Sequence, residues 1–336
     1  MSRLSLTFAC AGYDRMQALM TGEVRPDGID LNFIPVDNPR ELFDRMVGRL
    51  EFDLSEMSSS EYITRFAAGN CAFIALPVVA SRIFRHGFIA VDRRVVKKPK
   101  DLEGQRVGVQ LYSMTAAIWI RGILQHHYGV DVSGIEWVEG AIDGPHPHGK
   151  PTILPPLKPI KIVQNTSGKS LSELLEAGDI VATIGADLPP AFGKNPNVER
   201  LFPDFRQAEK DYYKQTGIFP IMHLIVVRRD VLEKHPFIAS SLYQAFCESK
   251  NLAYKRMRYL GALRYMLPWM TAELDEIQET FGGDPWPYGV EPNRKAIEAL
   301  VQYLVDQSMI ANPVLVDDLF ARVFDRTETP KHPAKM

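Results

Sequence analysis

One stretch of the sequence decides the fold: Val107-Gly-Val-Gln-Leu-Tyr-Ser-Met-Thr-Ala-Ala-Ile-Trp-Ile-Arg-Gly122. Its apolar beginning predicts a short buried strand, and the apolar positions that recur after Thr115 predict a helix, with Ser113 as the N-cap. Such a helix end presents unpaired N–H groups and the positive pole of the helix dipole, which favour a carboxylate or phosphate. An ordinary capped helix on a buried strand fits the same residues, so both interpretations stay open here.

The same alternation of short apolar strands and helices runs along most of the chain. A polar linker at 97–104 separates two such series, and the pattern becomes helical from Pro236 onward. This alternation predicts an α/β fold with mostly parallel sheets, and the linker predicts two lobes with a central cleft. The strands before the linker are expected at 4–10, 29–36, 52–57, 73–80 and 88–91, and those after it at 107–109, 135–139, 160–163, 180–184 and 224–227.

Composition and charge limit the classes of function. A chain of 336 residues is long enough for two domains, and its 39 basic residues nearly balance its 41 acidic ones. This balance argues against nucleic acid and a membrane surface as partners and favours a small-molecule ligand. The three cysteines are scattered singly and give no indication of a disulfide framework or a zinc knuckle.

The first ten residues alternate between apolar and polar side chains, which predicts a strand rather than a secretory leader. No stretch of the sequence is apolar enough to span a bilayer. We therefore expect a soluble, cytoplasmic protein.

Polar residues that directly follow predicted strands should face the cleft, because ligands of such folds bind at the carboxyl ends of strands. These residues are Tyr13, Asp14, Glu56, Ser58, Ser59, Ser60, Arg82, Arg85, His86, Tyr112, Ser113, Met114, Thr115, Asp187 and His223.

Several longer motifs follow one another along nearly the whole chain. They are Tyr13-Asp14-Arg15, Arg25-Pro26-Asp27-Gly28-Ile29-Asp30-Leu31, Phe52-Asp53-Leu54-Ser55-Glu56-Met57-Ser58, Arg82-Ile83-Phe84-Arg85-His86, Pro99-Lys100-Asp101-Leu102-Glu103-Gly104, Met114-Thr115-Ala116-Ala117-Ile118-Trp119-Ile120-Arg121-Gly122, Thr216-Gly217-Ile218-Phe219-Pro220-Ile221-Met222-His223 and Trp286-Pro287-Tyr288-Gly289. In these motifs and their order the chain resembles the 4,5-dihydroxyphthalate decarboxylase family. The resemblance implies a type II periplasmic-binding-protein-like fold, with lobe one formed by 1–94 and 219–336 and lobe two by 95–218.

The resemblance also implies an activity, namely the cofactor-independent decarboxylation of 4,5-dihydroxyphthalate to protocatechuate and carbon dioxide. We expect a small aromatic carboxylate as substrate and a homo-oligomer as the assembled form. Because we expect no export, an enzyme is favoured over the receptor of a transporter. Two alternatives stay open: a non-catalytic binding protein for a small aromatic acid or a pyrimidine precursor, and a decarboxylase of a related aromatic acid.

Loss of carbon dioxide from a hydroxylated aryl carboxylate needs a base near the phenol, an acid near the ring carbon and cations for the carboxylates. His86 and His223 are the candidates for proton transfer, because an imidazole titrates near neutrality. Arg82 and Arg85 are the candidates for binding carboxylates, because a guanidinium offers paired donors.

The other candidates carry two interpretations each. Glu56 either acts as an acid or caps the helix that begins near Ser58, and Asp187 either orients a histidine or starts a Pro-bounded turn. Ser113 and Thr115 are expected to donate hydrogen bonds to a carboxylate. Tyr13 and Tyr112 are expected to flank the ring, and Ser58 and Met114 to complete the substrate site.

No cofactor is expected. A divalent metal is compatible with a catechol and a Glu/His/Asp set, but the expected site has no HxH, HExxH or carboxylate-run motif. The one HxH motif is His146-Pro147-His148, which lies in a Pro/Gly-rich loop and is expected to be exposed. The role of His146 and His148 stays open.

Overall fold

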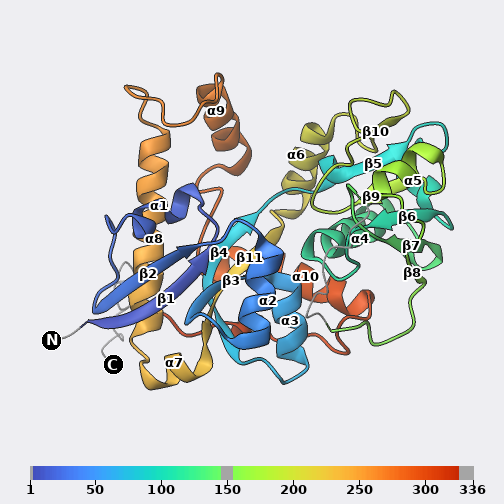
Figure 1. Cartoon of the computed structure of the whole chain (residues 1–336). Coiled ribbons are helices and arrows are strands. Elements are labelled where there is room, and N and C mark those ends of the chain that lie inside the picture. The colour runs from blue at the N-terminus through green and yellow to red at the C-terminus, as the bar shows by residue number, and fades with distance from the viewer. Residues whose placement is uncertain (1–2, 145–153, 325–336) are drawn as a thin grey trace, which may run out of the picture.

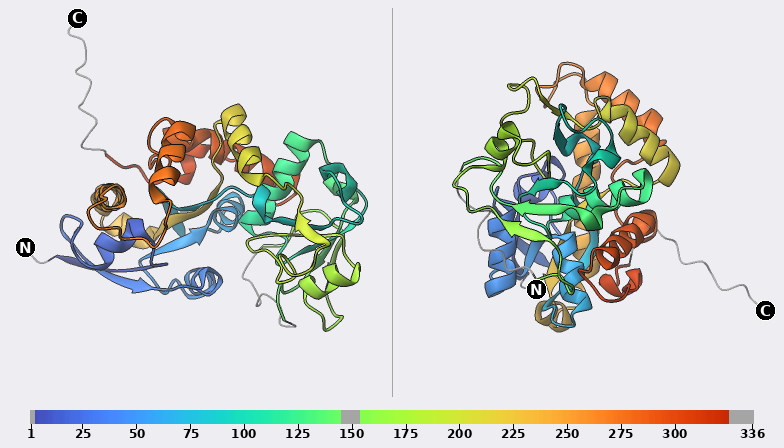
Figure 2. Two further views of the ribbon diagram at one scale, coloured as in Figure 1. Left: turned by 90° about the horizontal axis from the view of Figure 1, so that it is seen from above. Right: turned by 90° about the vertical axis from the view of Figure 1, so that its right-hand side faces the viewer.

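The computed structural model describes residues 3–144 and 154–324, so His146 and His148 lie outside the described residues. The chain forms two lobes, each built on one sheet (Figure 1). Figure 2 shows the two lobes side by side in the left view, whereas in the right view the second lobe lies in front of the first. The predicted α/β fold with two mixed, mostly parallel sheets is confirmed.

The first sheet has the strand order β2-β1-β3-β11-β4. Strand β1 pairs in parallel with β2 and β3, whereas β11 runs antiparallel between β3 and β4. The strands are β1 (Leu4–Cys10), β2 (Ile29–Pro35), β3 (Leu54–Ser58), β4 (Phe73–Arg82) and β11 (Ile221–Arg228).

The second sheet has the strand order β10-β5-β9-β6-β7-β8. Within this sheet β9 pairs in parallel with β6, β6 with β7, and β7 with β8. Strand β5 pairs antiparallel with β9, and β10 pairs antiparallel with β5. The strands are β5 (Ile89–Asp92), β6 (Arg106–Val109), β7 (Glu136–Glu139), β8 (Ile162–Gln164), β9 (Ala182–Ile184) and β10 (Val198–Arg200).

The helices surround the two sheets (Figure 1). The α-helices are α1 (Gln17–Met20), α2 (Pro39–Arg49), α3 (Ser59–Ala67), α4 (Thr115–Tyr128), α5 (Leu171–Ala177), α6 (Phe205–Thr216), α7 (Arg229–Lys234), α8 (Ile238–Met257), α9 (Met270–Phe281) and α10 (Arg294–Asp306). Short 3-10 helices are η1 (Asp14–Met16), η2 (His86–Phe88), η3 (Pro99–Leu102), η4 (Val132–Gly134), η5 (Glu291–Asn293) and η6 (Val316–Leu319). No helix of the described part of the chain is long and apolar enough to cross a membrane.

The boundary between the lobes differs from the prediction. Strand β5 pairs with β9 in the second sheet, so the chain leaves the first lobe between Arg82 and Ile89 and not after residue 94. The chain returns before β11, which begins at Ile221 in the first sheet. We call 83–88 and 217–220 the crossing segments, and they are joined by a hydrogen bond from the Ile83 amide to the Pro220 carbonyl (3.2 Å).

Helix α4 begins at Thr115, whereas Ser113 as the N-cap would place its first residue at Met114. Met114 is the N-cap residue, in an extended conformation, because its amide closes a turn onto the Leu111 carbonyl (3.2 Å) and the helix starts at Thr115. The Ser113 hydroxyl is buried and has no partner among the described residues, so the prediction that Ser113 caps the helix is wrong.

Helix α10 belongs to the first lobe by sequence but packs on α4 of the second. The contact depends on Gly122, because a Cβ atom at that position would overlap the ring of Tyr303. Below this contact Arg121 is fully buried, and its Nε donates to Gln307 Oε1 (2.7 Å) at the end of α10. The two lobes are therefore held together on this side by a tightly packed helix pair.

Candidate active site

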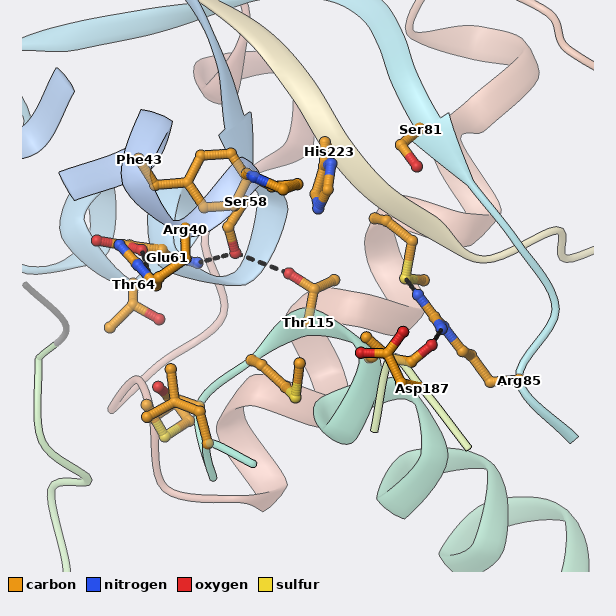
Figure 3. Close-up of a pocket in the computed structure, with 18 of the residues that line it drawn as sticks. Arg40, Phe43, Ser58, Glu61, Thr64, Ser81, Arg85, Thr115, Asp187 and His223 are labelled. Atoms are coloured by element: carbon orange, nitrogen blue, oxygen red, sulfur yellow. Dashed lines mark hydrogen bonds and ion pairs between the residues drawn. The ribbon is translucent and has the colours of Figure 1, made fainter. Parts of the chain in front are cut away.

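A pocket of about 290 Å³ lies in the cleft between the lobes (Figure 3). Its polar lining comes from the ends of strands and the first turns of helices, as expected for an α/β fold. Figure 3 shows Arg40 and Glu61 on one side of the pocket and Arg85 and Asp187 on the other, with His223 and Thr115 between them. The pocket size suits a molecule with a single ring.

The centre of the site is a histidine held by a buried carboxylate. His223 on β11 lines the pocket, and its Nδ1 lies 2.6 Å from Oε1 of Glu56 on β3. An ionised carboxylate only accepts hydrogen bonds, so Nδ1 carries the proton and Nε2 is left for a ligand. The ring is further fixed by an edge contact with Phe43 (centroids 5.0 Å apart).

Glu56 is fully buried and receives several hydrogen bonds. Burial alone would raise its pKa, but the hydrogen bonds and charge of His223, with the hydroxyl of Tyr13 and the Ala11 amide, lower the pKa to about 2. The Ala11 amide donates to Oε2 at 3.1 Å. Glu56 is therefore ionised at neutral pH and serves as the partner of His223 rather than as a cap for helix α3.

Tyr13 is not part of the pocket lining. Its hydroxyl donates to the same Glu56 oxygen as His223, at 2.6 Å. Burial raises the pKa of Tyr13, and the Glu56 charge adds to the shift, so the phenol stays protonated. The prediction that Tyr13 flanks the ligand ring is not met, because its hydroxyl is turned toward Glu56.

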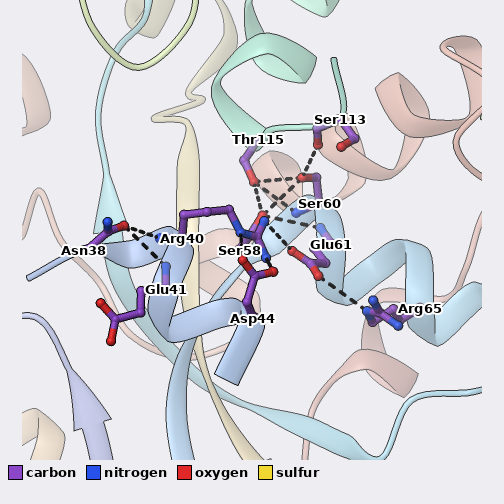
Figure 4. Close-up of polar contacts among 10 residues, drawn as sticks. All are labelled: Asn38, Arg40, Glu41, Asp44, Ser58, Ser60, Glu61, Arg65, Ser113 and Thr115. Carbon is purple, nitrogen blue, oxygen red and sulfur yellow. Dashed lines mark hydrogen bonds and ion pairs between the residues drawn. The ribbon is translucent and has the colours of Figure 1, made fainter. Parts of the chain in front are cut away.

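Hydroxyl groups connect the two lobes at the floor of the cleft (Figure 4). The Thr115 Oγ1 lies 2.9 Å from both Ser58 Oγ and Ser60 Oγ, and Ser60 Oγ donates to the Ser113 carbonyl at 2.9 Å. Ser58 is the N-cap of α3 and Thr115 is the first residue of α4. The N-termini of both helices therefore meet here, which makes the floor of the pocket favourable for an anion.

Arg85 brings a buried cation to the pocket. Only 6% of the residue is exposed, and burial lowers its pKa to about 10. Its Nη2 and Nε donate to the Met222 sulfur at 2.9 and 3.3 Å, and no carboxylate forms an ion pair with it within the described chain. A buried guanidinium without a counter-ion is costly, so this position favours an anionic ligand.

Sequence reasoning did not single out Arg40, which also lines the pocket. It lies in the first turn of α2, where the Asn38 side chain caps the helix. Its guanidinium is already paired with Asp44 (2.6 Å) and Glu61 (3.1 Å). The sequence signal that could have identified Arg40 is Asn38-Pro39-Arg40, a helix start soon after β2. The charge of the Arg40 guanidinium is compensated by Asp44 and Glu61.

Ser58, Ser113, Met114, Thr115 and Asp187 are all in the pocket lining. Asp187 is exposed, and Gln110 Nε2 donates to its Oδ2 at 3.4 Å. No hydrogen bond joins Asp187 to a histidine of the described ranges, so the prediction that it orients one is not met. Its charge instead acts on Arg85, where it partly opposes the effect of burial on the Arg85 pKa.

His86 does not reach the cleft. Its ring is 1% exposed and lies among the rings of Tyr128, Phe202 and Tyr212, at centroid distances of 5.3 to 5.9 Å. Neither ring nitrogen has a hydrogen-bond partner in the part of the chain described, and burial lowers its pKa to about 4. The structure therefore removes His86 from the candidates for proton transfer, because the chain turns into η2 and points this side chain inward.

Arg82 and Tyr112 are also placed outside the pocket. Arg82 Nη2 donates to Asn293 Oδ1 (2.6 Å), and its guanidinium lies over the ring of Phe219. Tyr112 is buried beneath the guanidinium of Arg121, which lies 3.7 Å from its ring centroid. Neither side chain contributes to the substrate site that was predicted for it.

Residues 3–144 and 154–324 contain no group of three or more His, Cys, Asp or Glu side chains placed to hold a metal ion.

The chain is 36% identical over 300 residues to a 4,5-dihydroxyphthalate decarboxylase of Comamonas testosteroni, covering 89% of this chain and 90% of the relative. The chain belongs to the 4,5-dihydroxyphthalate decarboxylase family. A second relative of this name, from Pseudomonas putida, is 35% identical over 217 residues, which cover 64% of this chain and 83% of that protein. No family model matches the chain. Both relatives are named as decarboxylases, which supports an enzyme.

Solved structures agree with the fold of this 4,5-dihydroxyphthalate decarboxylase family member. The periplasmic aliphatic sulphonate binding protein SsuA of Escherichia coli aligns with a TM-score of 0.52 at 13% identity, covering 96% of this chain and 98% of that one. The alkanesulfonate-binding protein SsuA of Xanthomonas axonopodis pv. citri, bound to MOPS, aligns with a TM-score of 0.50 at 12% identity and the same coverage. The predicted periplasmic-binding-protein-like fold is confirmed.

Proposed function

We propose that this protein is a carboxy-lyase that converts 4,5-dihydroxyphthalate to protocatechuate and carbon dioxide. Relatives of that name match most of the chain. The observation that carries the proposal is that one pocket combines His223, held by ionised Glu56, with the buried Arg85 guanidinium, which forms no ion pair with a carboxylate of the described chain. A proton-transfer group and an anion-binding group are what decarboxylation of an aryl carboxylate requires.

Arg85 anchors the carboxylate that is retained. The retained carboxylate keeps its negative charge throughout the reaction, so an ion pair between it and Arg85 stabilises substrate binding. An ion pair with the departing carboxylate would instead oppose the loss of charge when carbon dioxide leaves. The Arg85 side of the pocket is separated from the Glu61 side by His223 and Thr115 (Figure 3). The phenol hydroxyls then lie toward Ser58 and Glu61, and the ring lies beneath His223.

The reaction proceeds by protonation of the ring. The Glu61 carboxylate accepts the proton of the phenol that is para to the departing carboxylate, with Ser58 as a hydrogen-bond partner of that phenol, and electron density moves to the ring carbon that bears the carboxylate. His223 first takes up a second proton from solvent at Nε2, and this imidazolium donates the Nε2 proton to the ring carbon to form a dienone. The bond to the carboxylate breaks, carbon dioxide leaves, the electron pair returns to the ring and the phenolate regains its proton. The ionised Glu56 stabilises the imidazolium before it donates.

The proposal is tested with purified protein and 4,5-dihydroxyphthalate in ²H₂O. We expect equal amounts of carbon dioxide and protocatechuate, with one deuterium on the ring carbon that lost its carboxylate. A thermal shift without turnover would favour the alternative of a non-catalytic binding protein. Turnover of a different hydroxylated aromatic acid alone would favour the related decarboxylase.

Three further expectations belong to the same proposal. Catalysis is proposed to need no cofactor, so the rate should be unchanged after dialysis against a chelator and unchanged by added divalent ions. The protein is proposed to be cytoplasmic, which fractionation of the native cells tests. It is proposed to form a homo-oligomer, which light scattering of the purified protein tests.

A further inference from the structure

A second cavity, of about 360 Å³, shares no lining residue with the cleft pocket. It lies where the chain passes between the lobes, and we call it the hinge pocket. Its lining residues come from the end of β4, both crossing segments, the loop after β9, the end of β10 and helix α6. Those that matter here are Arg82, Phe84, Arg200, Phe205, Glu209 and Phe219.

Aromatic rings form much of the wall of the hinge pocket. Phe84 and Phe219, one from each crossing segment, stack with centroids 4.5 Å apart and an angle of 21° between the rings. Phe205 of α6 lies so close to Gly87 that a Cβ atom there would be 2.7 Å from its ring. These fixed aromatic surfaces favour a flat, apolar ligand body.

Two arginines bring positive charge to the same pocket. Arg82 is 6% exposed, and its buried Nε has no hydrogen-bond partner among the residues described. Arg200 donates from Nε to the Gly87 carbonyl (3.0 Å), and its guanidinium lies 4.5 Å from the Phe205 centroid. Neither arginine forms an ion pair with a carboxylate of the described chain. A buried guanidinium of this kind favours an anion.

One carboxyl group, that of Glu209, also lines the hinge pocket and limits the negative charge of a ligand that the pocket can bind. Glu209 Oε1 accepts a hydrogen bond from the Gly87 amide at 3.1 Å. Burial raises the pKa of Glu209 to about 7, so its charge is incomplete near neutral pH. The pocket thus carries more positive than negative charge, but a ligand with two negative charges would be repelled by Glu209 once it ionises.

We propose that the hinge pocket binds an aromatic monocarboxylate, with the ring against Phe84 and Phe205 and the carboxylate directed to Arg82 and Arg200. The shape and charge of the cavity carry this inference, so it does not depend on the reaction in the cleft. The occupant would contact both crossing segments. It would therefore sit where any change in the angle between the lobes is accommodated.

The proposal is tested with 4-bromobenzoate as probe, in crystals and by calorimetric titration in solution. We expect a bromine anomalous peak among Phe84, Phe205 and Phe219, and a binding event in solution that Ile83→Trp removes. Ile83 lines the hinge pocket but is 37% exposed, so a larger side chain there fills the cavity without entering the core. Ile83→Val is the matched control and should keep the binding event.

A second variant keeps the test decisive if Ile83→Trp does not fold. Arg200→Gln should weaken the same binding event by about tenfold, because it removes one charge-assisted hydrogen bond. Bromine density only in the cleft, or titrations of Ile83→Trp and Arg200→Gln identical to that of the wild type, would overturn the proposal. Failure of decarboxylation would leave it standing, because the two pockets share no lining residue.

Discussion

Nδ1 of His223 lies 2.6 Å from Oε1 of Glu56, and the hydroxyl of Tyr13 lies 2.6 Å from the same oxygen. The two donors come from strand β11 and from the turn after β1, while the carboxylate comes from β3 between them in the sheet. Three segments that are distant in sequence thus fix one imidazole, and its free nitrogen is the one that can act on a ligand.

Replacement of His223 by Ala should reduce the rate of protocatechuate formation by about 100-fold or more, because the proton donor is lost. His86→Phe is the control, since the His86 ring is enclosed by aromatic side chains and makes no hydrogen bond with the described residues. It should keep turnover within a few-fold of the wild type, as measured by chromatography of the product. Full activity of His223→Ala would contradict the assignment.

The Glu56 carboxylate should make stability depend on acid pH. Its pKa is about 2 in the folded protein, below the ordinary value of 4.5. The stabilisation is therefore complete above about pH 4.5 and is lost as pH falls toward 2, with a size on the order of 3 kcal/mol. Urea unfolding at several pH values should show this loss in the wild type but not in Glu56→Gln. Equal slopes in both proteins would refute the prediction.

Arg85→Ala should raise KM by about 10- to 100-fold, because a charged hydrogen bond to the retained carboxylate disappears. Arg85→Lys should recover part of the loss, since the charge remains but the paired donors do not. Arg294 pairs with Glu291 and Asp317 on the surface, so Arg294→Ala is a control for loss of a positive charge. The measurement is steady-state kinetics, and an unchanged KM in Arg85→Ala would exclude the anchoring role.

Glu209 should make the protein less stable as pH rises. Burial raises its pKa to about 7, above the ordinary 4.5, so the folded state holds the proton more firmly than the unfolded chain. Stability is thus lost between about pH 4.5 and 7, by on the order of 1–2 kcal/mol after allowance for solvent. Glu209→Gln should unfold at higher urea than the wild type at pH 8. Glu176→Gln, on the exposed side of α5, should show no such gain.

Gly122→Ala should destabilise the protein by about 2–3 kcal/mol, because its Cβ atom would overlap the Tyr303 ring where α10 packs on α4. Gly48→Ala is the matched control. That glycine lies on the exposed face of α2 with no atom within 4 Å of an added Cβ, so the change should stabilise by about 0.5–1 kcal/mol. Equal unfolding midpoints for the two variants would show that the α4–α10 contact is not tight.

The fold was predictable from the sequence, because short apolar strands alternate with helices and this alternation begins again after the linker at 97–104. The rule that polar residues after strands face the cleft placed Ser58, Thr115, Asp187 and His223 in the pocket lining. The roles proposed for them stay predictions. Their places were predictable because Ser58 and His223 are paired neighbours in the first sheet, and Thr115 and Asp187 follow neighbouring parallel strands, β6 and β9, of the second.

The rule failed where the chain passes between the lobes. Arg82 is the last residue of β4, and Arg85 and His86 follow it closely in the crossing segment, yet their side chains take different directions and only Arg85 lines the cleft pocket. Local spacing does not encode such directions, because they depend on which rings pack around the segment. Arg40 was missed for a different reason. It lies in the first turn of a helix and not directly at a strand end, so the rule did not select it.

The three oxygens that meet at the floor of the cleft, from Ser58, Ser60 and Thr115, have a chemical versatility that a lysine or an aspartate lacks. Each can turn its hydrogen toward a neighbour or away from it by rotation about a single bond. Ser58 and Thr115, which line the pocket, can therefore donate to an anionic group and afterwards accept from a neutral one while every heavy atom stays in place. A cleft floored in this way tolerates a change of charge in its occupant without rearranging the backbone.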